Sequence, residues 1–203
     1  SLVNGERTYS YWRNNSAATL QGQNINDVEH AVKKQDMIYF SGITLAILDP
    51  SSRNNLFSCL KSARRAGKKI AFDPNLRPRL WSDKKQMCDV IMAGANLSDI
   101  ILPSFEDEAT WFSDANPKAT LKRYQKVGAE IVVVKNAGEP VSFISNQGIG
   151  TYPVQSIETV IDSTAAGDSF NSEILVGILR NIPLSEAISN GANLANKVIM
   201  GHG

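Results

Sequence analysis

The sequence carries almost no net charge. Its 203 residues include 21 Lys and Arg against 20 Asp and Glu, which leaves +1. A chain so balanced has no general attraction for nucleic acid or for an anionic membrane, so we expect neither as a partner. No apolar run reaches the ~18 residues of a membrane span, and the N-terminal residues lack the order of a signal peptide. These absences favour a cytoplasmic protein that meets any anion at a local site.

Cysteine and two common phosphate-binding motifs are also scarce or missing. Cys59 and Cys88 have neither CxxC spacing nor a nearby His, so neither a zinc site nor a disulfide framework is indicated. We interpret both as packing residues. No GxxxxGK[ST] or GxGxxG pattern occurs. A phosphate-binding site in this chain would therefore be neither a P-loop nor a dinucleotide fold.

What the sequence does contain is a regular alternation of short apolar runs with amphipathic stretches. This order predicts an α/β fold, a mostly parallel sheet with helices on both faces, whose ligands lie beyond the carboxyl ends of the strands. We interpret residues 1–203 as one domain. Expected strands are 37–40, 69–72, 99–102 and 131–134, with short ones near 141–144 and 159–161. Expected helices begin near 26, 51 (capped by Ser51 or Ser52), 82, 104 and 117, and two more span about 166–179 and 184–200.

One segment combines a strand, a turn of small residues and a helix. Residues 160–170 pass from β-branched residues through Ala165, Ala166 and Gly167 into an amphipathic stretch that contains Asp168. A helix start with small side chains exposes N–H groups to an anion, and a carboxylate in its first turn can accept a proton from a hydroxyl. Equally, Asp162 or Thr164 caps the helix and Asp168 only complements its dipole. The residue types alone leave these two readings balanced.

A resemblance favours the first reading. Residues 162–168 are very similar to the Asp-Thr-Thr-Gly-Ala-Gly-Asp signature of ribokinase-like (pfkB) carbohydrate kinases. It implies the ribokinase-like fold, an anion hole for the γ-phosphate of ATP at Ala165, Ala166 and Gly167, and Asp168 as the catalytic base. Ala165 replaces the usual Gly, as is familiar among ketodeoxygluconate kinases. Glu173 stands where many relatives have Gly, and its carboxylate either lowers activity near the phosphates or faces solvent.

Two further segments resemble the substrate site of the ketodeoxygluconate kinases. Tyr11-Trp12-Arg13 resembles their Tyr-x-Arg lid strand, and residues 73–77 resemble their Asp-Pro-Asn-x-Arg segment. The resemblance implies that Tyr11, Arg13 and Arg77 bind the sugar acid, whose carboxylate suits the two parallel hydrogen bonds of an arginine. On residue types alone, Arg13 is an exposed strand residue and Arg77 caps carbonyls in a Pro-bounded turn.

The resemblance also assigns a nucleotide site and a metal residue. It implies ATP contacts from Lys135, Asn136 and Gly138, although relatives commonly read Lys-Asn-Gly-Ala where this chain has Ala137-Gly138. Further ATP contacts are expected from Asn75, Ala166, Gly167 and Asn196. Ser104-x-x-Asp107 occupies the place of the Asn-x-x-Glu motif that organises Mg²⁺ through water, with Glu108 as a substitute. The alternative is that Ser104 caps a helix with acidic residues in its first turn.

The expected activity is therefore ATP- and Mg²⁺-dependent phosphorylation of 2-keto-3-deoxygluconate at its terminal hydroxyl. The alternatives are a kinase of a neutral sugar such as fructose or ribose, and a non-catalytic sugar-acid or nucleotide sensor. The resemblance begins within the family's domain, so we expect residues 1–203 to be an incomplete kinase domain, with a lid strand at about 5–15 and the first strands and extreme C-terminus absent. A sheet without its first strands exposes an apolar edge. The lid sheet is also where family members commonly pair into oligomers.

Overall fold

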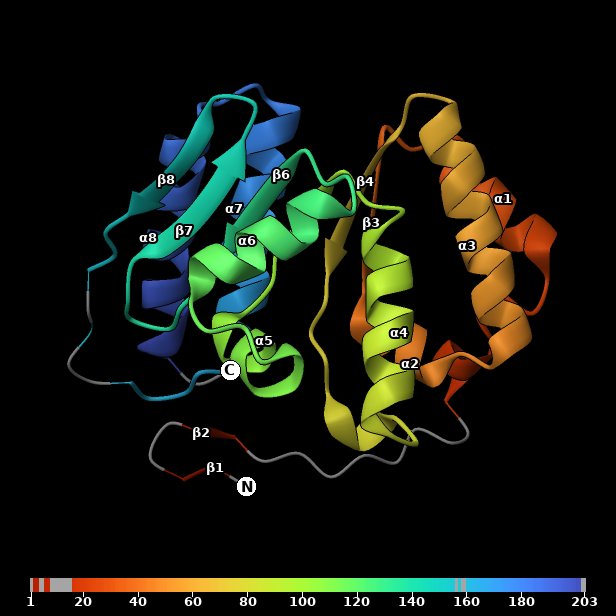
Figure 1. Ribbon diagram of the computed structural model, residues 1–203, viewed down its shortest axis with the longest axis horizontal. Coiled ribbons are helices and arrows are strands. Elements are labelled where there is room, and N and C mark those ends of the chain that lie inside the picture. The colour runs from red at the N-terminus through yellow and green to blue at the C-terminus, as the bar shows by residue number, and fades with distance from the viewer. Residues whose placement is uncertain (1, 4–5, 8–15, 156, 158–159, 202–203) are drawn as a thin grey trace. The chain divides into compact units, whose positions relative to one another are not determined.

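The computed structural model describes residues 2–3, 6–7, 16–155, 157 and 160–201 (Figure 1). The chain divides into two compact units, and each is described by itself. One unit comprises Trp12–Val134 and Phe143–Ile149. The other comprises Ser1–Tyr11, Lys135–Ser142 and Gly150–Gly203. The prediction of a single incomplete domain stays a prediction.

The elements follow the expected strand-helix alternation closely. The larger sheet has the strand order β3-β4-β5-β6-β7-β8, and the first four strands are parallel. A two-stranded antiparallel ribbon pairs β1 with β2. The strands are β1 (Leu2–Val3), β2 (Glu6–Arg7), β3 (Met37–Ser41), β4 (Lys69–Asp73), β5 (Ile100–Ile101), β6 (Ile131–Val134), β7 (Val141–Ser145) and β8 (Gly148–Tyr152). The helices are η1 (Ala17–Leu20), α1 (Ile25–Lys33), α2 (Gly42–Ile47), α3 (Pro50–Arg65), η2 (Pro78–Leu80), α4 (Lys84–Ala95), α5 (Phe105–Phe112), α6 (Pro117–Lys126), α7 (Ala166–Leu179) and α8 (Leu184–Ile199).

Two local predictions were wrong. The α3 helix is capped by Asp49, whose carboxylate accepts from the N–H groups of Ser51 and Ser52 at 2.8 and 3.0 Å, because Pro50 sets the first helical turn. Residues 160–161 are not a strand. The Ile161 N–H donates instead to the carbonyl of Ile199 at the end of α8, at 2.8 Å, so it is not available to a strand partner. The strand next to β7 in the sheet is instead β8.

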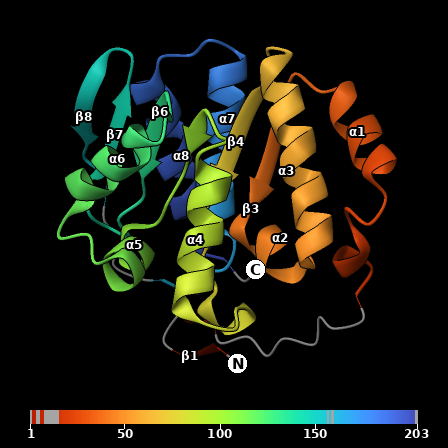
Figure 2. The same ribbon diagram turned by 45° about the vertical axis from the view of Figure 1, so that its right-hand side comes forward.

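The core of the first unit forms where the parallel strands meet their crossover helices. Phe40 of β3 and Phe72 of β4 are paired in register, and their rings stack with centroids 4.6 Å apart. Leu60 of α3 and Ile91 of α4 are fully buried in the same cluster. Figure 2 shows α3 running alongside β3 and β4, the strands that it connects. This packing brings the carboxyl ends of β3 and β4 to one edge, where the register pairs Ser41 with Asp73.

A close approach between backbones occurs at that edge. Gly42, the first residue of α2, follows β3 directly, and a Cβ atom placed on it would lie 1.7 Å from the carbonyl oxygen of Pro74 and 2.7 Å from Ile91. No side chain fits in that space, so only glycine permits the contact. Pro74 opens the loop after β4. The path of this loop therefore depends on Gly42.

In the second unit, α7 and α8 pack against each other (Figure 1). Gly177 of α7 faces Ala187 of α8, and Phe170 lies against Gly191. These small residues allow the two helices to approach closely, and Ile174 and Ile188 are buried with them. Among the described residues of the whole chain, no helix has the length and apolarity needed to span a membrane.

We predict that Gly42→Ala lowers the free energy of unfolding by at least about 3 kcal/mol, since the added methyl group collides with backbone that cannot move without displacing β4. Gly138→Ala is the matched control, because a methyl group there meets nothing within 4 Å. It should change stability by no more than about 0.5 kcal/mol. Chemical denaturation of both variants gives the comparison, and equal stabilities would contradict the assigned contact.

Candidate functional site

The turn before α7 is built around a buried carboxylate. Asp162 is fully buried, and its Oδ1 accepts from the backbone N–H of Thr164 at 3.0 Å and from its hydroxyl at 2.6 Å. The backbone N–H of Asp162 donates to the Ile199 carbonyl at 3.2 Å. Asp162 thus shapes the turn from within, through its hydrogen bonds to Thr164, and Ala165 stands at the N-cap position of the helix.

The residue at the helix boundary is Ala165, in the left-handed conformation with φ 63° and ψ 4°. Ala165 itself makes no side-chain capping hydrogen bond. The N–H of Ala166 donates to the Ser163 carbonyl at 3.3 Å, whereas Gly167 and Asp168 lie in the first turn, where a helix supplies no acceptor for N–H groups. Asp168 is exposed. The turn thus presents backbone donors and a carboxylate together, and of the three predicted anion-hole residues, Ala166 already donates its N–H internally.

Lys135 and Asn136 belong to the same unit as α7. The Lys135 ammonium donates to Oδ1 of Asn171 at 2.9 Å, and Asn171 is 1% exposed. Asn171 follows Asp168 by three residues on α7, so the two share one helix face. Sequence reasoning missed Asn171, although this spacing could have indicated it. The structure thereby brings a cation predicted to contact ATP next to the helix that carries the predicted base.

The turn after Lys135 has an unusual backbone. The Glu139 N–H donates to the Asn136 carbonyl at 2.9 Å, and Ala137 between them has φ 44°. Gly138 is exposed and is not among the residues with positive φ. The left-handed position that favours glycine is therefore occupied by alanine. The Ala-Gly order changes the local strain but does not prevent the turn.

Two other predicted positions of this unit lie on the closing helices. The side-chain amide of Asn196 on α8 donates to the Gln155 carbonyl at 3.1 Å, which ties the segment after β8 to the helix. Glu173 on α7 is half-buried. Asn196 therefore has a structural role, whether or not it borders a nucleotide.

A second group of predicted residues lies in the other unit, in the loop after β4. Asn75 has φ 31° and Arg77 has φ 44°, so two non-glycine residues of this loop adopt left-handed backbone. Leu76 between them is fully buried, and its carbonyl accepts from the indole N–H of Trp81 at 2.7 Å. Arg77 is exposed. This loop lies at the carboxyl edge of the parallel strands, where the sequence predicted a ligand site.

Asp107, on the first turn of α5, faces the same loop. Burial raises the pKa of its carboxyl, while a hydrogen bond from the Leu76 backbone N–H and the charge of Arg77 lower it. No group of three or more His, Cys, Asp or Glu within the described ranges forms a metal cluster. The expected water-mediated contact of Asp107 with Mg²⁺ stays a prediction.

Glu108 is not an alternative metal residue. It is fully buried, forms an ion pair with Arg123, and accepts from the Tyr124 hydroxyl at 2.9 Å. Arg123 also pairs with Asp114 at 2.7 Å. Burial raises the pKa of Glu108 to about 7, although Arg123 and Tyr124 oppose the rise. This network joins α5 to α6, so it supports the helix that carries Asp107.

Tyr11 and Arg13, predicted to bind the sugar acid, lie outside the described residues. The contact of Arg13 with a carboxylate therefore stays a prediction.

Cys59 is buried and Cys88 is partly buried, and both are free thiols, as their interpretation as packing residues requires. Ser104 stands at the cap position of α5, but its side chain makes no capping hydrogen bond.

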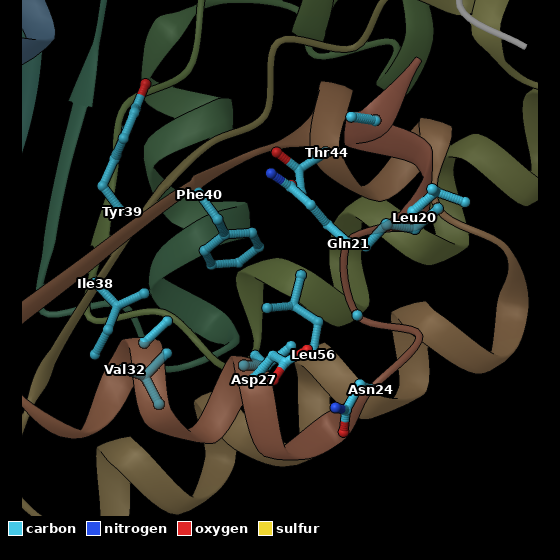
Figure 3. Close-up of a pocket in the computed structure, with 15 residues that line it drawn as sticks. Leu20, Gln21, Asn24, Asp27, Val32, Ile38, Tyr39, Phe40, Thr44 and Leu56 are labelled. Atoms are coloured by element: carbon cyan, nitrogen blue, oxygen red, sulfur yellow. The ribbon is translucent and has the colours of Figure 1, made fainter. Parts of the chain in front are cut away.

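A cavity of about 540 Å³ lies along β3, the first strand of the sheet (Figure 3). Figure 3 shows Val32, Ile38, Phe40 and Leu56 around it, with Asp27 and Asn24 at its polar side. None of the residues predicted to bind ATP, Mg²⁺ or sugar lines it. Its walls are mostly aliphatic and aromatic, and they offer no cation for a phosphate. We therefore do not assign the catalytic site to this cavity.

The model of the pfkB family of carbohydrate kinases matches residues 1–203. The 2-dehydro-3-deoxygluconokinase of Haemophilus influenzae is 37% identical over 98% of this chain, which spans 65% of that relative. A fructokinase of Vibrio alginolyticus is 30% identical over 87% of this chain and 56% of its own length. The crystal structure of a PfkB protein from Polaromonas superposes with a TM-score of 0.82 at 27% identity, over 95% of this chain and 62% of that one.

We predict that the contribution of Glu108 to stability falls as pH rises from 4.5 to about 7. The folded state binds this proton more tightly than the unfolded state, whose carboxyl has the ordinary pKa of 4.5, so the stabilisation is complete below pH 4.5 and is lost through pH 7. The difference in free energy of unfolding between wild type and Glu108→Gln should therefore shrink by up to about 1.4 kcal/mol per pH unit in that window. Urea titrations at several pH values measure it, and a difference independent of pH would refute the raised pKa.

We also predict that Ala165→Gly stabilises the protein by about 1 kcal/mol, because it relieves a left-handed alanine. Ala166→Gly makes the same chemical change one residue later, at a helical position, and should be neutral or destabilising. The denaturation midpoints of the two variants should thus move in different directions. A loss of stability in Ala165→Gly would rule out the assigned strain.

Proposed function

The chain belongs to the pfkB family of carbohydrate kinases, and from this premise we propose that the whole protein transfers the γ-phosphoryl group of ATP to the terminal hydroxyl of 2-keto-3-deoxygluconate. The product is 2-keto-3-deoxy-6-phosphogluconate. The observation that supports this most is the turn before α7, where free first-turn donors and the exposed Asp168 occur together. The name of the Haemophilus relative supports the choice of sugar acid.

In this proposal Asp168 is the catalytic base. As the sugar hydroxyl attacks the γ-phosphorus, its proton passes to the Asp168 carboxylate. A new bond forms between the hydroxyl oxygen and phosphorus, the bond between the γ-phosphorus and the bridging oxygen breaks, and ADP leaves. An exposed carboxylate suits this role, because it can reach a bound hydroxyl.

The backbone donors stabilise the charge of the transferring group. The N–H groups of Gly167 and Asp168 point out of the helix start, where the helix dipole also favours an anion. Lys135, oriented by Asn171, supplies a positive charge for the ATP phosphates. Mg²⁺ bound to ATP neutralises part of the same charge, and we assign no residue of this chain as its direct ligand.

The sugar acid is selected by arginine. Arg77 and Arg13 provide guanidinium groups that match the planar carboxylate through paired hydrogen bonds. A neutral sugar has no group to satisfy them, and its binding would leave these donors without their acceptor. This separates the proposal from a fructokinase or ribokinase activity.

We expect the full-length protein to phosphorylate 2-keto-3-deoxygluconate with kcat/KM at least about 100-fold above fructose and ribose. Asp168→Asn should lower kcat by about 10²–10⁴-fold with a smaller effect on the KM for ATP, since the base acts in the transition state. Coupled measurement of ADP release gives both quantities. Glu186→Gln is the matched control, because Glu186 is an exposed acid in the first turn of α8.

The outcome also decides between the alternatives. A preference for fructose or ribose would refute the carboxylate selection and favour a neutral-sugar kinase. Binding of ATP and the sugar acid without turnover in wild type would favour a sensor. Unchanged kcat in Asp168→Asn would remove Asp168 as the base.

A further inference from the structure

The loop after β4 passes through two residues that have left-handed backbone although neither is glycine. Asn75 has φ 31° and Arg77 has φ 44°, and Arg77 precedes Pro78, whose ring further restricts it. Such conformations persist only where surrounding contacts hold them, and they are frequent at ligand sites. The same two residues are predicted to meet ATP and the sugar acid. The contacts that hold this loop therefore bear on both substrates.

Leu76, between these two residues, is held by its side chain and by its carbonyl. The side chain is fully buried in the hydrophobic core. The carbonyl oxygen accepts a hydrogen bond from the indole N–H of Trp81, with 2.7 Å between the two heavy atoms. Between them lies η2, in which the Leu80 N–H donates to the Arg77 carbonyl at 2.9 Å. The Trp81 indole therefore closes this stretch of chain back onto Leu76.

The Trp81 ring is itself held in place by other elements. It is partly buried and packs against the hydrophobic core. The guanidinium of Arg53, on α3, lies 5.6 Å from the ring centroid, within the range of a cation–π interaction. Arg53 is fixed in turn, because its Nε and Nη2 atoms donate to the carbonyls of Leu45 and Leu48 where α2 ends, at 2.9 and 3.0 Å. The ring is thus a fixed point from which the indole N–H reaches the loop.

We propose that Trp81 is a positioning residue for both substrates: by holding the Leu76 carbonyl, its indole fixes the backbone of the two left-handed residues. The proposal rests on the proposed function, because it assumes that Asn75 contacts ATP and that Arg77 meets the carboxylate of the sugar acid. Trp81 itself touches neither substrate, so its effect lies in binding and not in the transfer step. A tryptophan that only filled the core would change stability and leave both KM values as they are.

The kinetic test uses Trp81→Phe in the full-length protein, which keeps a ring against the core and removes the N–H donor. Without this donor the loop populates conformations that do not present the two binding residues, and apparent affinity falls with the competent fraction. We expect the KM for 2-keto-3-deoxygluconate and the KM for ATP each to rise by about 3- to 10-fold, with kcat changed by less than about 2-fold. Trp111→Phe is the matched control, because it makes the same chemical change at a partly buried tryptophan of α5 and should leave both KM values unchanged.

A double variant tests whether Trp81 acts on the sugar acid through Arg77. The sugar KM of Trp81→Phe/Arg77→Gln should equal that of Arg77→Gln alone within about 2-fold, because the two residues lie in one path. The KM for ATP should still rise in the double variant, since Asn75 is intact. Unchanged KM values in Trp81→Phe, or a full further rise of the sugar KM in the double variant, would overturn the proposal.

A second measurement does not depend on activity. In Trp81→Phe the backbone amide of Leu80 should exchange its hydrogen at least about 5-fold faster than in wild type, because η2 loses the tether that closes it onto Leu76. Trp111→Phe should leave this exchange unchanged. If exchange responds but wild type phosphorylates no sugar acid, the proposed function fails while the tether stands. Unchanged exchange in Trp81→Phe would refute the tether itself.

Discussion

The contact between Gly42 and the carbonyl of Pro74 determines how the first unit presents its carboxyl edge. Because no Cβ fits between them, the start of α2 and the loop after β4 can lie directly against each other. Two residues after Pro74, the side chain of Leu76 is fully buried in the core. The contact between these two backbone segments therefore sets the geometry of the loop. The positions of Asn75 and Arg77 depend on that geometry.

In the second unit, the turn before α7 also contains a left-handed residue that is not glycine. Asp162 is buried with its hydrogen bonds directed to Thr164, and this arrangement leaves Ala165 in a left-handed conformation just before α7. Ala137 adopts a similar conformation after Lys135. Glycine would relieve the backbone at both alanines. Strain thus occurs in the turns next to residues predicted to meet phosphate, and also at Asn181 after α7.

Periodicity in the sequence predicted most strands and helices, since β3, β4 and β6 are apolar runs and α7 starts where small residues give way to an amphipathic pattern. It failed for residues 160–161, because a β-branched pair looks like a strand when the partner of the Ile161 N–H, the carbonyl of Ile199, is nearly 40 residues away. The motif indicated Asp168 and Arg77. It could not indicate the hydrogen bond from the Trp81 indole to the Leu76 carbonyl, because a side chain that bonds a backbone group leaves no pattern in the sequence.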